Sequence, residues 1–255
     1  MKLKAGIKLY LKEFSMGASV YYGISLGLTL IGIVLATISS SNGNTNINGT
    51  SEFGMFIFMF IMGILLFTTY MKFFLQNGVS RKTIFKSGIV SVAMFSLLFS
   101  LIDTLIVIVL QKLGHKGMLL VYSSLYGGAE FGVGKELSSV SEFFFVWIWT
   151  AALYLFATFI GIITGLAFYR LTKIGRLLLG SVLGGGLIIL LPIVEMTITK
   201  GAIVKSVFRF LKFIFGLQNI SNPTPMMWVL SSVIICAVLG IFSFLLLRRA
   251  APQKA

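Results

Sequence analysis

Six long apolar stretches, each ended by polar or charged residues, constrain this chain more than any other feature. A helix needs about 20 mainly apolar residues to cross a hydrocarbon core about 30 Å thick, and lipid offers no partners to unpaired backbone groups. The sequence therefore predicts an all-α integral membrane protein with a single transmembrane domain over residues 1–255. The six predicted spans are residues 16–38, 53–75, 87–110, 143–169, 177–197 and 226–247.

The composition agrees with this fold class. The chain is 57% hydrophobic and 11% charged, whereas a soluble domain has about 45–50% apolar and about 25% charged residues. The net charge of +14 would suggest nucleic-acid binding in a soluble protein, but here the basic residues separate apolar runs. We therefore interpret the charge as a sign of membrane topology and expect no nucleic-acid partner.

The distribution of Lys and Arg predicts the orientation, because cations near helix ends are retained in the cytoplasm. An N-in, C-in arrangement puts most of the 21 cations in cytoplasmic segments and none in the first external loop, residues 39–52. The cytoplasmic cations would be Lys2, Lys4, Lys8, Lys12, Lys72, Arg81, Lys82, Lys86, Arg170, Lys173, Arg176, Arg248, Arg249 and Lys254. The predicted location is therefore a cell membrane that the chain crosses several times, with both chain ends on its cytoplasmic side.

Two segments are amphipathic but too polar or too short to span. In residues 2–14 lysines recur every fourth position opposite an apolar stripe, which predicts an interfacial helix on the cytoplasmic side. Residues 201–216 have a similar pattern and are predicted to form an external amphipathic or re-entrant helix between spans five and six. The tryptophans Trp147, Trp149 and Trp228 are expected to anchor external helix ends in the interface.

The sequence carries no recognisable catalytic or metal site. It has no G-x-x-x-x-G-K-[ST] phosphate loop, no H-E-x-x-H and no G-x-S-x-G. Its only histidine, His115, falls in a predicted external loop, and its only cysteine, Cys236, lies in an apolar span, which favours a small buried hydrophobe. We expect no enzyme activity, no metal and no cofactor bound to this chain.

Two carboxylates fall within apolar spans, Asp103 in the third and Glu195 near the external end of the fifth. A charge in the bilayer is costly, so such groups tend to face a protein interior or a watery cavity. One hypothesis is that both line a translocation path and meet cationic groups of a substrate. The alternative is structural: Glu195 would pair with Lys200, and Asp103 would bond hydroxyls nearby in its own helix, such as those of Ser100 or Thr104.

The fifth predicted span contains Gly184, Gly185 and Gly186. Small residues allow helices to pack closely in lipid, and successive glycines also permit local bending. The residues are therefore candidates either for a packing surface or for a hinge.

The loop between spans two and three is the segment most indicative of function. It begins with the turn signal Asn77-Gly78, and Ser80 can cap a short helix. Basic and apolar groups then follow on neighbouring faces, where Ile84 and Phe85 would be exposed. Ordinary topogenic charge explains the cations alone, whereas a docking element on a cytoplasmic partner explains both sets. The candidate docking residues are Asn77, Gly78, Val79, Ser80, Arg81, Lys82, Thr83, Ile84 and Phe85.

With this loop the chain resembles the ABC-2 type permeases, the membrane subunits of bacterial ATP-binding-cassette exporters. The resemblance rests on the run N-G-x-S-R-K-x-x-F at residues 77–85 and on the order of elements: an amphipathic N-terminal helix, six spans, and an amphipathic segment between spans five and six. In that family the loop after span two forms a coupling helix on the ATPase.

The resemblance implies two permease chains, identical or paralogous, and two ATPase chains that bind ATP and Mg²⁺. The small size and low-charge spans are similar to exporters of amphipathic peptides or peptide antibiotics in Gram-positive bacteria, including the phenol-soluble-modulin type. The leading hypothesis is thus an exporter of amphipathic peptides or related hydrophobic compounds. The alternatives are a non-transporting membrane partner, such as an immunity or sensor subunit, and a membrane enzyme.

Overall fold

The computed structural model of the protein describes residues 2–39, 51–112, 121–126, 140–171, 174–175, 177, 202–218 and 223–249, and this part is all-helical, as the sequence predicts. Its helices are α1 (Lys2–Ser39), α2 (Ser51–Thr68), α3 (Tyr70–Gln76), α4 (Arg81–Lys112), α5 (Val121–Tyr126), α6 (Val140–Arg170), α9 (Ala202–Ile214) and α10 (Met226–Arg249).

Five stretches in the described residues are long and apolar enough to cross a membrane, which is compatible with a multi-pass membrane protein. They are Lys4–Gly32, Glu52–Gln76, Arg81–Val109, Val140–Arg170 and Met226–Arg248. Each overlaps a predicted span. The predicted fifth span, residues 177–197, falls almost wholly outside the described residues, as do Gly184, Gly185, Gly186 and Glu195. The number of six spans therefore stays a prediction.

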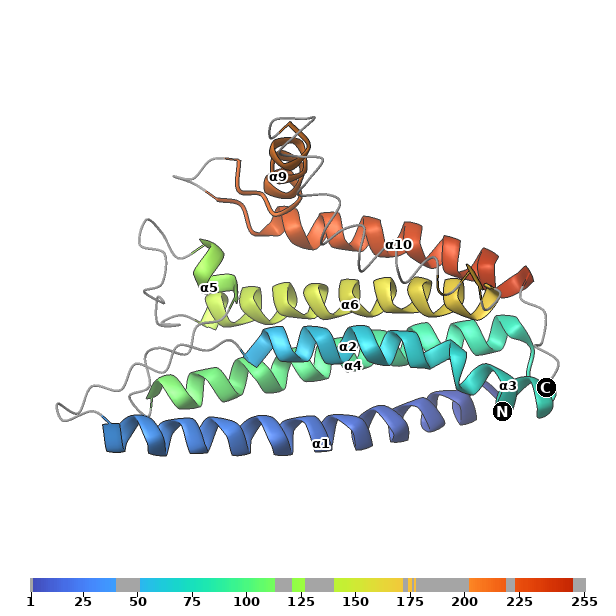
Figure 1. The fold of residues 1–255 in the computed structure, drawn as a ribbon, viewed down its shortest axis with the longest axis horizontal. Coiled ribbons are helices and arrows are strands. Elements are labelled where there is room, and N and C mark those ends of the chain that lie inside the picture. The colour runs from blue at the N-terminus through green and yellow to red at the C-terminus, as the bar shows by residue number, and fades with distance from the viewer. Residues whose placement is uncertain are drawn as a thin grey trace.

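The long helices form a bundle in which α1 and α4 run in one direction and α2, α6 and α10 in the other (Figure 1). The rings of Trp149 and Trp228 lie 6.1 Å apart near the starts of α6 and α10, and Phe159 packs near Gly240 further along both helices. Helices α6 and α10 are therefore parallel. Successive membrane spans run in opposite directions. Two parallel spans such as α6 and α10 are therefore expected to have an odd number of spans between them in the sequence.

One end of the bundle gathers the segments that the charge pattern predicts to be cytoplasmic. The start of α1, the turn between α3 and α4, and the ends of α6 and α10 all lie there (Figure 1). A hydrogen bond joins two of them, since the Arg81 guanidinium donates to the carbonyl oxygen of Arg248 at 2.6 Å. This end is called the basic end below.

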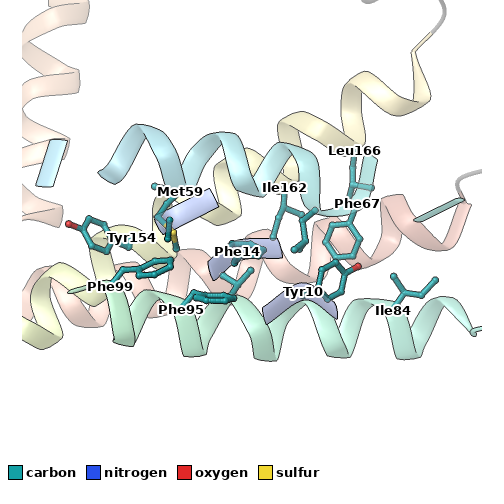
Figure 2. Packing of buried hydrophobic residues seen from close by; sticks show 14 of the residues in the cluster. Tyr10, Phe14, Met59, Phe67, Ile84, Phe95, Phe99, Tyr154, Ile162 and Leu166 are labelled. Carbon is teal, nitrogen blue, oxygen red and sulfur yellow. The ribbon is translucent and has the colours of Figure 1, made fainter. Parts of the chain in front are cut away.

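Aromatic and aliphatic side chains fill the space between α1, α2, α4 and α6 (Figure 2). Phe14 of α1 stacks on Phe95 of α4 with ring centroids 4.5 Å apart, and Phe95 stacks in turn on Phe99 at 5.1 Å. Because lipid is itself apolar, such helices associate through close packing rather than by hiding surface from water. The aromatic stacks give α1 its main contact with the rest of the bundle.

Glycines bring α2 and α6 into backbone contact. A Cβ atom added to Gly161 would lie 2.1 Å from the carbonyl oxygen of Phe60, and one added to Gly165 would lie 2.6 Å from that of Ile64. Gly63 of α2 faces the same contact, with the Thr158 carbonyl oxygen 2.3 Å from its added Cβ. The Gly161-x-x-x-Gly165 spacing is the small-residue motif that allows helices to approach closely in membranes. No larger residue fits this contact without moving the helices apart.

The N-terminal segment differs from the sequence-based expectation. The sequence predicts an interfacial helix at 2–14 and a span at 16–38, whereas α1 is one continuous helix from Lys2 to Ser39. The division of this helix into an interfacial part and a span stays a prediction. Lys4, Lys8 and Lys12 are exposed, but Tyr10 and Phe14 are fully buried, with the Tyr10 ring 5.3 Å from that of Phe74. No proline interrupts the sequence of α1, and burial against α3 and α4 holds the segment to the protein.

Two of the tryptophans predicted as interface anchors belong to the protein core. Trp149 and Trp228 are each 1% exposed and pack in one cluster with the end of α9. Their position near the starts of α6 and α10 matches the prediction, but their rings contact protein. Cys236 is buried, as predicted.

Candidate functional site

Two buried carboxylates lie inside the bundle toward the end opposite the basic end. Glu52, at the start of α2, is fully buried, and its Oε1 accepts a hydrogen bond from the Thr150 hydroxyl at 3.1 Å. Asp103 of α4 is 1% exposed and accepts a hydrogen bond from the hydroxyl of Tyr154. We call Glu52, Asp103, Thr150 and Tyr154 the acidic cluster.

The geometry of α6 assembles the cluster. Thr150 and Tyr154 are four residues apart, so their side chains share one face of the helix, one turn from each other. Each hydroxyl serves one carboxylate, and Tyr154 is placed where it interacts electrostatically with both Glu52 and Asp103. Tyr22 of α1 also lies beside Asp103. Four helices thus converge on two acidic side chains.

The acidic cluster has unused hydrogen-bonding capacity. The Oδ1 atom of Asp103 is buried and has no hydrogen-bond partner among the described residues. Buried carboxylates in membrane proteins are costly and tend to mark paths for ions, protons or polar groups. Within the described ranges no three His, Cys, Asp or Glu side chains come together as a metal site. A buried carboxylate oxygen of this kind can accept a proton or pair with a cationic group.

The prediction that Asp103 bonds the hydroxyl of Ser100 or Thr104 is wrong. The Ser100 hydroxyl donates to the carbonyl oxygen of Leu97, and the Thr104 hydroxyl donates to that of Ser100, so neither serves the Asp103 carboxylate. The partner comes from α6, which the sequence of α4 alone could not reveal. The sequence places Glu52 at the edge of a predicted external loop, so its burial was not predicted. Thr150 and Tyr154, two polar residues at helical spacing in an apolar span, could have indicated a buried polar partner.

The candidate docking loop is a tight turn rather than a helix of its own. Gly78 has φ 66°, and the Val79 N–H donates to the Phe74 carbonyl oxygen at 3.0 Å, which ends α3. The Ser80 Oγ then accepts a hydrogen bond from the Thr83 N–H at 3.3 Å and caps α4. The predicted turn and cap are confirmed. A separate coupling helix is not, because α4 continues from Arg81 directly into its span.

The side chains of this loop divide into an exposed tip and a packed base. Asn77, Gly78, Ser80 and Lys82 are exposed. The predicted exposure of Ile84 is wrong, since this residue is fully buried. The remaining docking candidates, Val79, Arg81, Thr83 and Phe85, are half-buried. The surface available to a partner is therefore the tip.

Phe85 connects this loop with an apolar cavity. Its ring lies 6.1 Å from that of Phe67 in α2 and 5.2 Å from that of Phe244 in α10. The same ring lines a cavity of about 490 Å³, largely open on one side, between α4, α6 and α10, whose walls also include Phe159 and Cys236. The base of the loop is thus one wall of an open apolar cavity.

Comparisons of this chain with protein-family models, with curated proteins and with solved structures found no match. The resemblance to ABC-2 permeases therefore rests on the residues and elements described above.

Proposed function

We propose that this chain is the transmembrane permease subunit of an ATP-binding-cassette exporter in a bacterial cytoplasmic membrane. A separate ATPase subunit, which binds ATP and Mg²⁺, would dock on the exposed tip formed by Asn77, Gly78, Ser80 and Lys82. The transported molecules would be amphipathic peptides or related hydrophobic compounds. Two copies of each subunit are expected, the second permease being either identical or a paralogue.

The observation that carries this proposal is the place of Phe85. The residue belongs to the same short loop as the exposed tip, and its ring is also a wall of the apolar cavity. A displacement applied at the tip would reach the cavity through one side chain. That is the connection an exporter needs between ATP hydrolysis and its substrate path.

Further contacts at the base of the loop support transmission of movement. The Arg81 guanidinium bonds the end of α10, and Ile84 is buried in the main core cluster. Movement of the loop would therefore shift α4 and α10 together relative to α6 and change the cavity that the three helices line. Packed elements transmit small displacements because dense interiors resist local compression.

The acidic cluster fits the same function. A cationic group of such a substrate would pair with Asp103, whose Oδ1 atom has no hydrogen-bond partner among the described residues. Apolar side chains of a substrate would enter the cavity that Phe85 lines, while its ammonium groups would meet Asp103 and Glu52. The predicted path residue Glu195 and the predicted hinge at Gly184, Gly185 and Gly186 remain part of the proposal.

Separate substitutions in the tip and in the base test this assignment. Lys82→Glu should reduce the amount of ATPase that co-purifies with the chain, because it reverses a charge on the docking surface. Phe85→Ala should leave that amount unchanged but lower substrate-stimulated ATP hydrolysis about tenfold, the size of effect expected when a coupling residue is lost. Both are measured on complexes purified from native membranes, with thermal stability as a check on folding.

One outcome would contradict the exporter, and another would contradict only the coupling role of this loop. If no ATPase co-purifies with the unaltered chain, the protein is better described as a non-transporting membrane partner. If an ATPase co-purifies and the Arg81→Ala/Phe85→Ala double variant still transports normally, the function stands but this loop is not the coupling element.

A further inference from the structure

Helix α9 exposes several large apolar side chains. The exposed fraction ranges from 46% to 62% for four of these side chains, Val207, Phe208, Phe210 and Phe213. Lys205, Arg209 and Lys212 are also exposed, and at 100° per residue they share a narrow stripe on the other side of the helix. A wide apolar face with a narrow cationic stripe is typical of helices that lie in a membrane interface.

The position of α9 suits the same environment. The helix is seen end-on where α10 lies in the plane of the picture, so it crosses the bundle direction (Figure 1). It lies beside the start of α10, and the end of α1, the end of α4 and the start of α6 extend further from the basic end. A helix that crosses the direction of the spans is parallel to a membrane surface. This orientation favours an interfacial helix over a re-entrant one.

An aromatic anchor holds α9 in this orientation. Phe215 stacks on Trp228 with ring centroids 4.3 Å apart and planes at 3°. The Tyr126 hydroxyl of α5 donates to the carbonyl oxygen of Phe215 at 2.6 Å, and burial raises the pKa of Tyr126 to about 12, so this donor keeps its proton at neutral pH. Gly216, with φ 67°, then turns the chain toward α10.

The anchor also determines which way the apolar face points. Ile214 and Phe215 continue the apolar face of α9, and both pack against the cluster at the start of α10. The apolar face therefore contacts the bundle at the C-terminal end of α9, and the cationic stripe lies on the other side of the helix.

We infer that α9 binds anionic phospholipids of the leaflet at this end of the bundle, the predicted outer leaflet. Its phenylalanines enter the acyl region, and its three cations bind headgroup phosphates. Positive charge at an anionic surface strengthens binding, and each cation contributes independently when it lies near the headgroups. This inference concerns lipid and does not depend on the proposed transport function.

The first test locates the two faces of α9. Cys236→Ala removes the only cysteine, and spin labels are then placed at Phe210→Cys or Arg209→Cys in the full chain reconstituted in vesicles. The label at position 210 should be accessible to oxygen, which concentrates in the acyl region, and protected from a water-soluble nickel reagent. The label at position 209 should be accessible to the nickel reagent and less accessible to oxygen. Exposure of position 210 to nickel, or its protection from both reagents by a protein partner, would overturn the inference.

The second test measures lipid preference in nanodiscs that contain phosphatidylglycerol and phosphatidylcholine. The preference of the bound lipid for phosphatidylglycerol should fall about fivefold in Arg209→Gln and further in the triple Gln variant. Arg209→Lys should retain the preference, and Ser206→Gln in the same helix serves as an uncharged control. An unchanged preference in the triple variant would exclude anionic lipid as the ligand of this stripe.

Discussion

Gly161→Ala should destabilise the protein by about 3 kcal/mol, the upper end of the cost of overpacking. The added methyl group would lie 2.1 Å from the Phe60 carbonyl oxygen, so α2 and α6 must separate. Since this contact is made by backbone atoms, no side-chain rotation can relieve it. Thermal unfolding of the purified protein in detergent should show a midpoint roughly 10 °C lower.

A matched control comes from α1. Gly27→Ala makes the same chemical change in a long helix, but no atom lies within 4 Å of the added Cβ. Its midpoint should be unchanged or slightly higher, because alanine favours helix more than glycine does. Equal midpoints for the two variants would show that the close contact between α2 and α6 is not required for stability.

Tyr154→Phe should destabilise the protein by about 2–3 kcal/mol, because hydrogen bonds to charged groups are among the strongest. The substitution keeps the ring and removes only the hydroxyl that serves Asp103. Asp103 would then be left in the bundle without this donor, and its other oxygen already has no partner in the described residues. Thermal unfolding of the purified variant in detergent, compared with that of the unaltered protein, measures the effect.

A double-mutant cycle isolates the interaction between the two residues. Asp103→Leu alone leaves the Tyr154 hydroxyl unsatisfied, whereas Asp103→Leu with Tyr154→Phe leaves neither group. The double variant should therefore lose at least 1 kcal/mol less stability than the sum of the single variants. Additive losses would mean that the hydrogen bond contributes nothing specific.

Transport separates a structural from a functional role for this acid. Asp103→Asn keeps the shape of the side chain and removes its charge. If Asp103 meets cationic groups of a substrate, export should fall while expression and stability stay normal. Unchanged export would remove Asp103 from the substrate path and leave the acidic cluster with a purely structural role.

The apolar periodicity of the sequence was sufficient to predict the fold class and most span positions. The turn at Asn77-Gly78 and the cap at Ser80 were also predictable, because both depend on residues close together in the chain. The burial of Ile84 could not be predicted, because it depends on which helices pack beside the start of α4. The burial of Tyr10 and Phe14 was not predictable for a similar reason: these residues could face lipid or protein, and their partners come from α3 and α4.

The contact between α2 and α6 was partly predictable from the sequence, whereas the acidic cluster was not. The Gly161-x-x-x-Gly165 motif was visible in the sequence and could have indicated close packing, although not the identity of the partner helix. Glu52 and Asp103 are separated by a whole span and a loop, so no local pattern associates them. Their meeting at Thr150 and Tyr154 appears only once α6 lies between α2 and α4.

The sequence by itself determined that this chain is helical and apolar enough to cross a membrane several times, because lipid requires each span to satisfy its own backbone groups. It also determined the amphipathic character of α9, which depends on local spacing alone. The tertiary structure decided which polar groups are buried together and which loop residues stay exposed. Those outcomes depend on contacts between distant segments, and in lipid many helix pairings bury similar apolar surface, so close packing and specific hydrogen bonds select among them.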